Sequence, residues 1–244
     1  MPAKPKNIVV IGSSGAIASA FIKRLADENP EASIKGFSRH PDQSKHASAN
    51  ILYQLIDYED ESSIARCAQM ASSQAPIDLL LVGNGILHDA QMRPEKSLKD
   101  LSVENFQRVF AINTILPALI AKHFLPKLNR KSPSIFAALT ARVGSISDNR
   151  LGGWYAYRAS KAALNMIIKN AAIEVQRTNK QAIVVGLHPG TVDSDLSKPF
   201  QGNVPEGKLF TPDYSAGQLL AVLATLSNEH SGKCFAWDGQ EIQA

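Results

Sequence analysis

The chain has 244 residues, of which 44% are hydrophobic and 20% are charged, and its formal net charge is +4. This is the composition of an ordinary soluble globular protein with enough apolar material for a core. Its basic residues are interleaved with acidic ones and do not gather into a tract with aromatic residues, which argues against a nucleic-acid partner.

The apolar runs are too short for a membrane span. Residues 114–121 form one of the longest, far below the ~20 residues that a transmembrane helix needs. The first residues lead directly into an apolar run at 8–11, without the features of a signal peptide, so we expect a cytoplasmic protein with no membrane partner. Cys67 and Cys234 lie far apart and show no metal-ligand spacing, so we expect reduced thiols and no metal site.

Short apolar runs alternate with amphipathic stretches along the whole chain. This alternation is typical of an α/β fold with a parallel sheet covered by helices on both faces. We therefore predict a single domain over residues 1–244 with seven strands. The predicted strands are Asn7–Ile11, Ser33–Ser38, Ile51–Leu55, Ile77–Val82, Ser134–Leu139, Ala182–His188 and Lys233–Trp237.

Five helices are predicted between these strands. Ser102 is placed to cap the third helix, and Thr211 followed by Pro212 predicts the start of the last. The predicted helices are Ala16–Glu28, Glu59–Ser73, Val103–Leu128, Trp154–Thr178 and Pro212–Ser227.

Four irregular segments remain, at 39–50, 86–101, 142–153 and 190–209. Loops at the carboxyl ends of parallel strands form the ligand crevice of such a sheet, so three of the four are candidates for ligand contact. The segment around 190–210 has the composition of a mobile lid with apolar anchors.

A glycine-bearing turn follows the first predicted strand and opens the first helix. In the run Gly12-Ser13-Ser14-Gly15-Ala16-Ile17-Ala18, free backbone N–H groups and a positive helix end could bind a pyrophosphate. We predict cofactor contacts at Gly12, Ser14 and Ile17. The same residues would also form any tight strand-to-helix turn, which is the alternative interpretation.

The second strand ends at Ser38-Arg39. A protein that reads a ribose 2′-hydroxyl would place a carboxylate here, whereas an arginine suits a 2′-phosphate, so Ser38 and Arg39 predict NADP. Arg39 could instead be a solvated loop residue. Asp57, after the third strand, is placed either to bind the adenine amino group or to cap the helix that begins near Glu59.

Tyr157 and Lys161 lie four residues apart on the predicted fourth helix and share one face. A nearby ammonium favours the phenolate and lowers the pKa of the phenol from its usual value near ~10. Such a phenol is suited to donate a proton during reduction of a carbonyl. Tyr155 lies roughly 240° around the helix from Lys161 and cannot share that face.

These motifs together resemble those of the short-chain dehydrogenase/reductase family over nearly the whole chain. The resemblance rests on the glycine turn, Arg39, Gly83-Asn84-Gly85, Asn113, Tyr157-x-x-x-Lys161 and Pro189-Gly190-Thr191-Val192-Asp193-Ser194. Within the family, residues 141–149 and 152–158 look like the C-factor-like branch of carbonyl reductases.

The resemblance implies a doubly wound Rossmann fold that binds NADP(H). Tyr157 would protonate the carbonyl oxygen, and Lys161 would bind the ribose hydroxyls and lower the phenol's pKa. Asn113 would bend the long helix and hold a water behind the lysine, with a buried packing role as the alternative. Further cofactor contacts are expected at Gly83, Asn84, Gly85, Pro189, Gly190, Val192 and Ser194.

Three positions depart from the family's pattern. Ala16 and Ala18 stand where the family has its second and third glycines, and residues 82–85 differ from the family's Asn-Asn-Ala-Gly. The catalytic serine is uncertain: counting from the fifth strand gives Thr140 or Ala141, whereas counting back from Tyr157 gives Ser145. We assign Ser145 and keep Thr140 as the alternative.

The predicted function is NADPH-dependent reduction of a small, apolar aldehyde or ketone. Its pocket would be walled by Leu87, His88, Trp154, residues 196–200 and Phe210. The rival hypothesis is an NADP(H)-binding regulatory or signalling protein of the same fold with little turnover, suggested by the altered glycines and the uncertain serine. Family analogy predicts a homodimer or homotetramer through the helices at 103–128 and 154–178.

Overall fold

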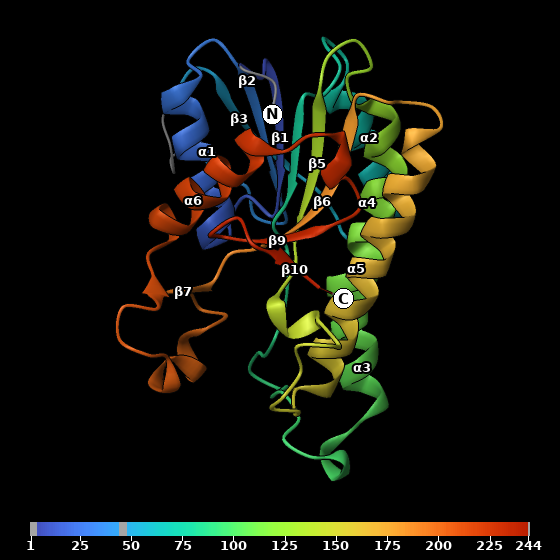
Figure 1. Ribbon diagram of the computed structural model, residues 1–244. Coiled ribbons are helices and arrows are strands. Elements are labelled where there is room, and N and C mark those ends of the chain that lie inside the picture. Colours follow the sequence, from blue (N-terminus) through green and yellow to red (C-terminus); the bar gives the residue numbers. More distant parts are fainter. Residues whose placement is uncertain (1–3, 44–47, 244) are drawn as a thin grey trace.

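The computed structural model describes residues 4–43 and 48–243, and these form three layers with a sheet in the middle (Figure 1). The sheet has eight strands in the order β10-β9-β6-β5-β4-β1-β2-β3. Seven of them run parallel, as predicted, and β10 pairs antiparallel with β9. The strands of this sheet are β1 (Asn7–Ile11), β2 (Ser33–Ser38), β3 (Ile51–Leu55), β4 (Leu79–Val82), β5 (Ser134–Leu139), β6 (Ala182–His188), β9 (Cys234–Ala236) and β10 (Glu241–Ile242).

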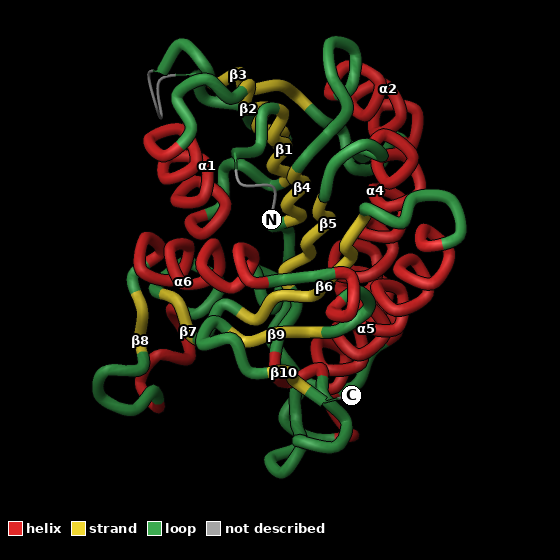
Figure 2. The backbone as a smooth tube through the Cα atoms, turned by 45° about the horizontal axis from the view of Figure 1, so that its top comes forward, coloured by secondary structure: helices red, strands yellow, loops and turns green. Residues whose placement is uncertain are grey.

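Helices cover both faces of the sheet. Figures 1 and 2 show α1 and α6 on one face and α2, α4 and α5 on the other. The helices are α1 (Ala16–Glu28), α2 (Glu61–Ala71), α3 (Val103–Phe110), α4 (Leu116–Phe124), α5 (Tyr155–Gln176) and α6 (Pro212–Thr225). Short 3₁₀ turns lie at Leu98–Asp100, Leu125–Lys127, Arg142–Gly144, Lys198–Asn203 and Asn228–His230.

The central strands are apolar on both faces because each face meets a helical layer. In β1, Ile8 and Val10 join the core beneath α1 and α6, whereas Val9 and Ile11 join the core beneath α2, α4 and α5. This division follows from the alternation of side chains along a strand. All four residues are fully buried, and burying such a side chain contributes about 1.5–3 kcal/mol.

The structure corrects two predicted strands and adds three short ones. Ile77 makes only an isolated bridge with Leu128, so β4 begins at Leu79. The chain leaves β9 at Ala236 to turn into β10, with the Ala236 N–H donating to Gln240 O at 2.8 Å. Strands β7 (Thr191–Val192), β8 (Leu209–Phe210) and β10 have two residues each, too few to show an alternating pattern in the sequence.

The predicted helix at 103–128 is interrupted. Between α3 and α4 the chain forms a π-helical turn at Ala111–Ile115, which contains Asn113. Such a turn widens the helix and often marks a functional position. The two predicted caps are confirmed: the Ser102 side chain accepts from Asn105 N, and the Thr211 side chain accepts from Tyr214 N.

Within the described residues, one helical stretch, Val103–Lys127, is long and apolar enough to cross a membrane. Of its most apolar 18 residues, 50% are buried inside the fold, where α4 packs against α2 and α5. Its apolar character is therefore accounted for by its place in the helical layer that covers the sheet.

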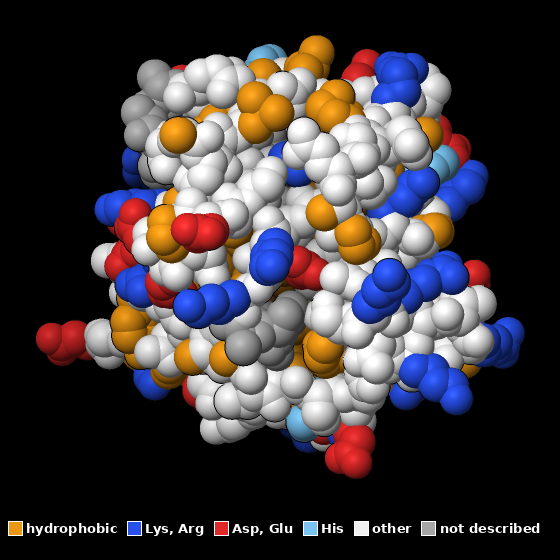
Figure 3. All heavy atoms as spheres, turned by 90° about the horizontal axis from the view of Figure 1, so that it is seen from above, with side chains coloured by type: hydrophobic (Ala, Val, Ile, Leu, Met, Phe, Trp, Pro, Cys, Tyr) orange, Lys and Arg blue, Asp and Glu red, His pale blue; other side chains and the backbone are white. Residues whose placement is uncertain are grey.

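The strands end at the lower edge of the molecule in Figure 1, where the irregular segments gather. The segment with β7 and β8 extends to the lower left, and the amino-terminal end of α3 lies at the lower right. Figure 3 views the opposite edge, where the strands begin; Lys and Arg side chains there are scattered among acidic and uncharged ones.

Candidate active site

Tyr157 and Lys161 come together near the amino-terminal end of α5, as predicted. Both side chains are buried, with 8% and 3% of their surface exposed. The Lys161 ammonium nitrogen lies 5.9 Å from the centre of the Tyr157 ring. Helical spacing and burial thus place a phenol and an amine beside each other at the carboxyl edge of the sheet.

The position of Lys161 is fixed by backbone on both sides. Its ammonium donates to Leu139 O at 2.9 Å, at the end of β5. Gly144 packs against the base of the same side chain, where an added Cβ would lie 2.8 Å from Lys161 Cβ. A residue larger than glycine at 144 would displace the lysine, a requirement that the sequence analysis did not identify.

Asn113 connects the π-helical turn to this pair. Its side-chain oxygen accepts from Ile86 N at 2.8 Å, and its amide donates to Ile86 O at 2.9 Å and to Ser160 Oγ at 3.1 Å. Ser160 Oγ in turn donates to Tyr157 O at 2.7 Å. Asn113 therefore lies in the site as predicted, and its water-holding role stays a prediction. Ser160 was missed, although it directly precedes the lysine.

Burial controls the proton affinity of both groups. It raises the pKa of Tyr157 to about 12 and lowers the pKa of Lys161 to about 8. The expected lowering of the phenol's pKa by the ammonium is therefore wrong, because loss of solvation outweighs the attraction of the cation. At neutral pH Tyr157 is protonated, which is the state that a proton donor requires.

Thr140, Ala141 and Ser145 are the three candidate positions for the catalytic serine near Tyr157. Thr140 Oγ1 donates to Asn165 Oδ1 at 2.6 Å, so its proton is already engaged. Ser145 Oγ accepts from Asp148 N at 3.2 Å and lies 3.3 Å from Ser147 Oγ. Ser145 can still donate its own proton and remains the better candidate of the two.

Of the three candidate positions, Ala141 is the one that belongs to the apolar cluster around Tyr157. It forms one apolar cluster with Tyr157 and Leu87, and partly buried side chains of Trp154 and Phe200 pack against this cluster. Among the described residues, no hydrogen bond joins Tyr157 to either Ser145 or Thr140. The assignment of Ser145 as the catalytic hydroxyl stays a prediction.

The segment around 190–210 covers this apolar wall. The Phe200 ring lies 5.0 Å from that of Trp154 and 5.6 Å from that of His88, centre to centre. The Nε2 atom of His88 lies 3.0 Å from Asp195 O and 3.2 Å from Leu196 O. His88 thus connects the loop after β4 to this segment, and the mobility of the segment as a lid stays a prediction.

At the other end of the edge, Gly12 makes the turn after β1. Its φ of +79° favours glycine, and an added Cβ would lie 3.0 Å from Asn84 N in the loop after β4. Ser14 is exposed and Ile17 is half-buried at the start of α1. The Gly15 N-cap has no side-chain hydrogen bond, so no side-chain cap occupies the first N–H groups of α1.

Ala16 and Ala18, which stand where the family's motif has glycines, fit the fold. Ala18 is buried, and an added Cβ at Gly83 would lie 3.0 Å from Ala18 Cβ. The missing side chain at Gly83 therefore makes the room that a glycine at 18 would otherwise provide. Asn84 follows, donating to Ile112 O at 2.7 Å, and Gly85 lies next to the Asn113 oxygen and the Lys161 nitrogen.

A cleft of about 380 Å³ opens beside the ends of β1 and β2. Three hydroxyls in it, those of Ser13, Ser38 and Tyr53, are buried and have no hydrogen-bond partner among the residues that the structure describes. Unpartnered buried hydroxyls are costly, and a polar ligand would satisfy them. These donors fit a phosphate-bearing nucleotide, although Asp42 lines the same cleft. Ser38 was predicted; Ser13 and Tyr53 were not.

Arg39 does not line this cleft. Its guanidinium lies 5.9 Å from the centre of the Tyr58 ring, and the residue is exposed. Arg39 directly follows Ser38, which lines the cleft, and Tyr58 comes after β3. An exposed guanidinium is free to reorient toward a 2′-phosphate at modest cost.

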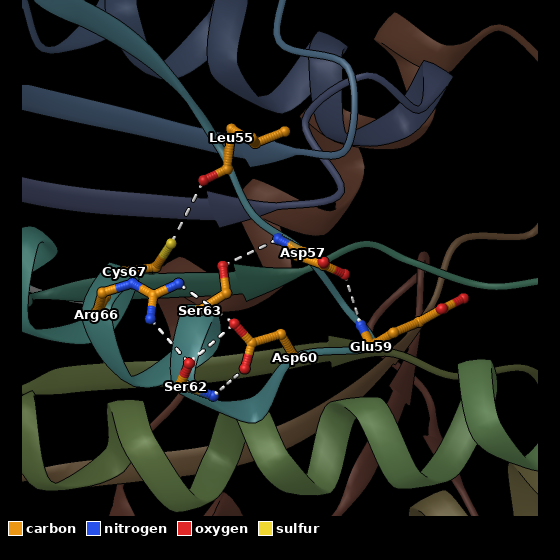
Figure 4. A network of polar contacts seen from close by, with 8 residues as sticks. All are labelled: Leu55, Asp57, Glu59, Asp60, Ser62, Ser63, Arg66 and Cys67. Atoms are coloured by element: carbon orange, nitrogen blue, oxygen red, sulfur yellow. Dashed lines mark hydrogen bonds and ion pairs between the residues drawn. The ribbon is translucent and has the colours of Figure 1, made fainter.

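Asp57 does not cap α2. Its Oδ1 accepts from Glu59 N at 2.9 Å, whereas Asp60 accepts from Ser62 N at 2.8 Å and is the N-cap (Figure 4). The capping alternative for Asp57 is therefore wrong. Its exposed carboxylate remains available for a ligand. Figure 4 also shows Cys67 directed to Leu55 O, and burial raises the pKa of this thiol.

The residues predicted for the nicotinamide end lie around the turn after β6. Pro189 O accepts from Ser215 Oγ at 2.8 Å, and Gly190 lies against the Phe210 ring. Val192 is buried in β7, and Ser194 Oγ donates to Val192 O at 3.2 Å. The Ser194 hydroxyl is therefore committed to its own turn. Within residues 4–43 and 48–243, no group of three metal-ligating side chains could hold a metal ion.

A family model described as short chain dehydrogenase matches residues 6–204. The chain belongs to the short-chain dehydrogenase family. This short-chain dehydrogenase is 35% identical over 146 residues to C-signal of Myxococcus xanthus, covering 60% of this chain and 82% of the relative. It is 28% identical over 238 residues to 1-hydroxy-2-glutathionyl-2-methyl-3-butene dehydrogenase of Rhodococcus sp. (strain AD45), covering 97% and 98% of the two chains.

Among solved structures, this short-chain dehydrogenase shares the fold of the NADPH-bound carbonyl reductase from chicken fatty liver. The TM-score is 0.86, the sequence identity is 24%, and the match covers 99% of this chain and 100% of the other. The predicted family, its likeness to C-factor-like proteins and the α/β fold are thereby confirmed.

Proposed function

We propose that this oxidoreductase reduces the carbonyl of a small aldehyde or ketone to an alcohol with NADPH. The observation that carries the proposal is the buried Tyr157–Lys161 pair beneath an apolar wall, at the same sheet edge as the cleft with unpartnered hydroxyls. The chicken carbonyl reductase that shares this fold binds NADPH, which supports the choice of coenzyme.

The residues at the ends of β1 and β2 would hold the nucleotide half. Gly12 and the start of α1 offer backbone N–H groups to the pyrophosphate, and Ser38 with Arg39 would bind a 2′-phosphate. When bound, NADPH supplies the hydride.

Tyr157 would donate its proton to the carbonyl oxygen. Its high pKa keeps the phenol protonated until a substrate oxygen accepts the proton. Lys161, held by Leu139 O, would bind ribose hydroxyls and stabilise the phenolate that proton transfer leaves. Asn113 and Ser160 fix the backbone around Tyr157 and so keep this geometry.

The apolar wall would exclude water from the reacting carbonyl. Leu87, Ala141, Trp154 and Phe200 surround Tyr157, and the lid is fastened by His88. A dry site strengthens the effect of a positioned proton donor.

A Tyr157→Phe variant tests the proposal. We expect its kcat for a panel of aldehydes and ketones to fall by about 10²–10⁴-fold, because general acid catalysis contributes about that much. NADPH affinity should change less than about twofold, since the phenol hydroxyl alone is removed. Tyr155→Phe is the matched control, two residues earlier and on another face of α5, and should retain full activity. Equal rates in Tyr157→Phe and the parent would remove Tyr157 from the mechanism.

A regulatory or signalling protein with little turnover is the second candidate. The observation that favours it is Ala141, which has no hydroxyl to offer beside Tyr157. A parent protein that binds NADPH but consumes none with any carbonyl of the panel would support this candidate.

We also propose assembly into a homodimer or homotetramer in the cytoplasm. Exposed apolar side chains on the two long helices support assembly: Ile115, Met166 and Ile173 are 54%, 60% and 49% exposed. Light scattering of the purified protein after size exclusion measures the mass directly, and a monomer at micromolar concentration would contradict the proposal.

A further inference from the structure

A second cleft, of about 320 Å³, opens where β5, β6 and β9 end. In the strand order, β4 separates it from β1 and β2, whose ends form the nucleotide end. Six of its lining residues carry the argument: Arg142, His188, Lys208, Phe210, Trp237 and Asp238.

The loop after β5 connects this cleft to the apolar cluster around Tyr157. Arg142 directly follows Ala141, which packs against Tyr157, and it begins the 3₁₀ turn that packs on α5. On the other side, Phe210 belongs to β8 at the base of the lid. A molecule that touches both Tyr157 and this cleft would therefore reach from the reacting group to the base of the lid.

Positive charge dominates the cleft, which two cations and one carboxylate line. Arg142 is 48% exposed and lies 3.7 Å from its one described ion partner, Asp148, so that pair is loose. Lys208 has no ion pair among the described residues, and its ammonium lies 5.9 Å from the centre of the Trp237 ring. Asp238 accepts from Gln240 N at 3.2 Å in the turn to β10.

His188 adds a neutral polar group with an unused ring nitrogen. Its Nδ1 is buried and has no hydrogen-bond partner within residues 4–43 and 48–243. Burial lowers the pKa of His188 to about 4; Arg142 lowers it further, and the opposing effect of Asp238 is smaller. The imidazole is thus neutral at pH 7, and the positive charge of the cleft comes from Arg142 and Lys208. An unpartnered buried nitrogen is costly and would be satisfied by a polar ligand atom.

We propose that the carbonyl substrate carries a carboxylate, which binds in this cleft to Arg142 and Lys208 with a hydrogen bond from His188. This inference rests on the proposed carbonyl reduction, and it names the substrate class as oxo acids. The Phe210 and Trp237 rings, 4.6 Å apart, would contact the carbon body between the two polar ends. Arginine suits the recognition because its planar group pairs with a carboxylate through two donors.

Matched substrates test the proposal. We expect 3- or 4-carboxybenzaldehyde to be reduced with at least about tenfold higher kcat/KM than its methyl ester, a ratio that corresponds to about 1.4 kcal/mol. Arg142→Gln and Lys208→Gln should each bring the acid-to-ester ratio close to one while leaving the ester rate and NADPH affinity within about twofold. Arg150→Gln, an exposed cation of the same loop that does not line the cleft, is the control and should keep the parent ratio.

Direct binding separates this proposal from the proposed function. The chain has two tryptophans, so in a Trp154→Phe variant Trp237 alone reports on the cleft. We expect benzoate, added to the NADP⁺-bound protein, to change Trp237 fluorescence saturably, and benzylamine to have no such effect. The benzoate signal should weaken with rising salt and be lost in Arg142→Gln.

The outcomes are distinguishable. Benzoate binding that Arg142→Gln abolishes, without turnover of any aldehyde, would keep the anion cleft and reject carbonyl reduction. Equal reduction of acid and ester, with no saturable benzoate signal, would reject the cleft and keep the reductase. A loss of NADPH affinity in Arg142→Gln would assign the cleft to the coenzyme, and preference for benzylamine would assign it to Asp238; either result overturns the proposal.

Discussion

Along the carboxyl edge of the sheet, close contacts between backbone segments shape the nucleotide end, whereas aromatic side chains wall the substrate end. At the nucleotide end, Gly12 and Gly83 bring backbone segments together, and the cleft offers the hydroxyls of Ser13, Ser38 and Tyr53. At the substrate end, Trp154, Phe200 and Phe210 fill the space around the lid. A nucleotide held by backbone N–H groups needs close approach of the chain, whereas a substrate pocket is shaped by side chains. Added methyl groups at Gly12 and Gly83 should therefore weaken binding of the nucleotide.

The sharpest test of that difference is Gly12→Ala. An added Cβ would meet Asn84 N at 3.0 Å in a left-handed backbone conformation. We expect the Kd for NADPH to rise at least about 100-fold and the free energy of unfolding to fall by about 1–3 kcal/mol. Titration calorimetry and chemical denaturation measure the two effects.

Gly15→Ala is the matched control for Gly12→Ala. Gly15 has an ordinary φ of −69° and only Gly12 O, at 3.3 Å, near an added Cβ. We expect a change of less than about threefold in the Kd. Equal losses in both variants would mean that close backbone approach does not distinguish this end of the sheet edge.

Lys161, where the two ends meet, makes stability depend on pH. Burial lowers its pKa from 10.5 to about 8, so between these values the unfolded chain binds the proton and the folded chain does not. The free energy of unfolding should therefore rise with pH across this window, by about 2 kcal/mol between pH 8 and 9.5. Denaturation of the parent and of Lys161→Met at both pH values isolates the contribution, because the variant lacks this titration. A parallel response in both proteins would show that the amine is solvated.

The Arg39→Ala variant tests whether the nucleotide end binds a 2′-phosphate. We expect the Kd for NADPH to rise about tenfold or more and that for NADH to change less than about twofold, because hydrogen bonds between charged groups contribute about 1.5–3 kcal/mol. Arg66→Ala, an exposed arginine on α2, is the control. Parallel losses for the two coenzymes would mean that Arg39 does not select between them.

The smallest expected effect concerns the hydroxyl at the substrate end. Ser145→Ala should lower kcat about tenfold, and Thr140→Val should leave it within about threefold, because the Thr140 proton is engaged by Asn165. Adding Ala141→Ser to Ser145→Ala should restore part of the rate, since residue 141 packs against Tyr157. An unchanged kcat in Ser145→Ala would leave polarisation of the carbonyl to Tyr157 alone.

The local sequence pattern was sufficient to predict the structure wherever a residue's neighbours in the sequence are also its neighbours in space. The bounds of β1, β2, β3, β5 and β6 were all predicted correctly. Tyr157 and Lys161 share a helix face because of helical periodicity, and Gly12 opens α1 because the turn and the helix are adjacent. The family motif added the loop after β4 and Asn113.

Contacts between distant segments could not be predicted in this way. The sequence does not show that Gly144 packs against Lys161, or that His88 contacts the segment around 190–210 at residues 195 and 196. Arg142, His188 and Asp238 stand on three separate strand ends, and only the strand order β9-β6-β5 brings them into one cleft.

The sequence by itself determined the α/β alternation, the glycine turn and the face shared by the tyrosine and the lysine, because periodicity and backbone conformation are local properties. The tertiary structure alone decided the protonation of that pair. Whether burial or the neighbouring cation controls the pKa of Tyr157 depends on how completely β5, the π-helical turn and the lid exclude water, and that exclusion is set by packing between segments far apart in the chain.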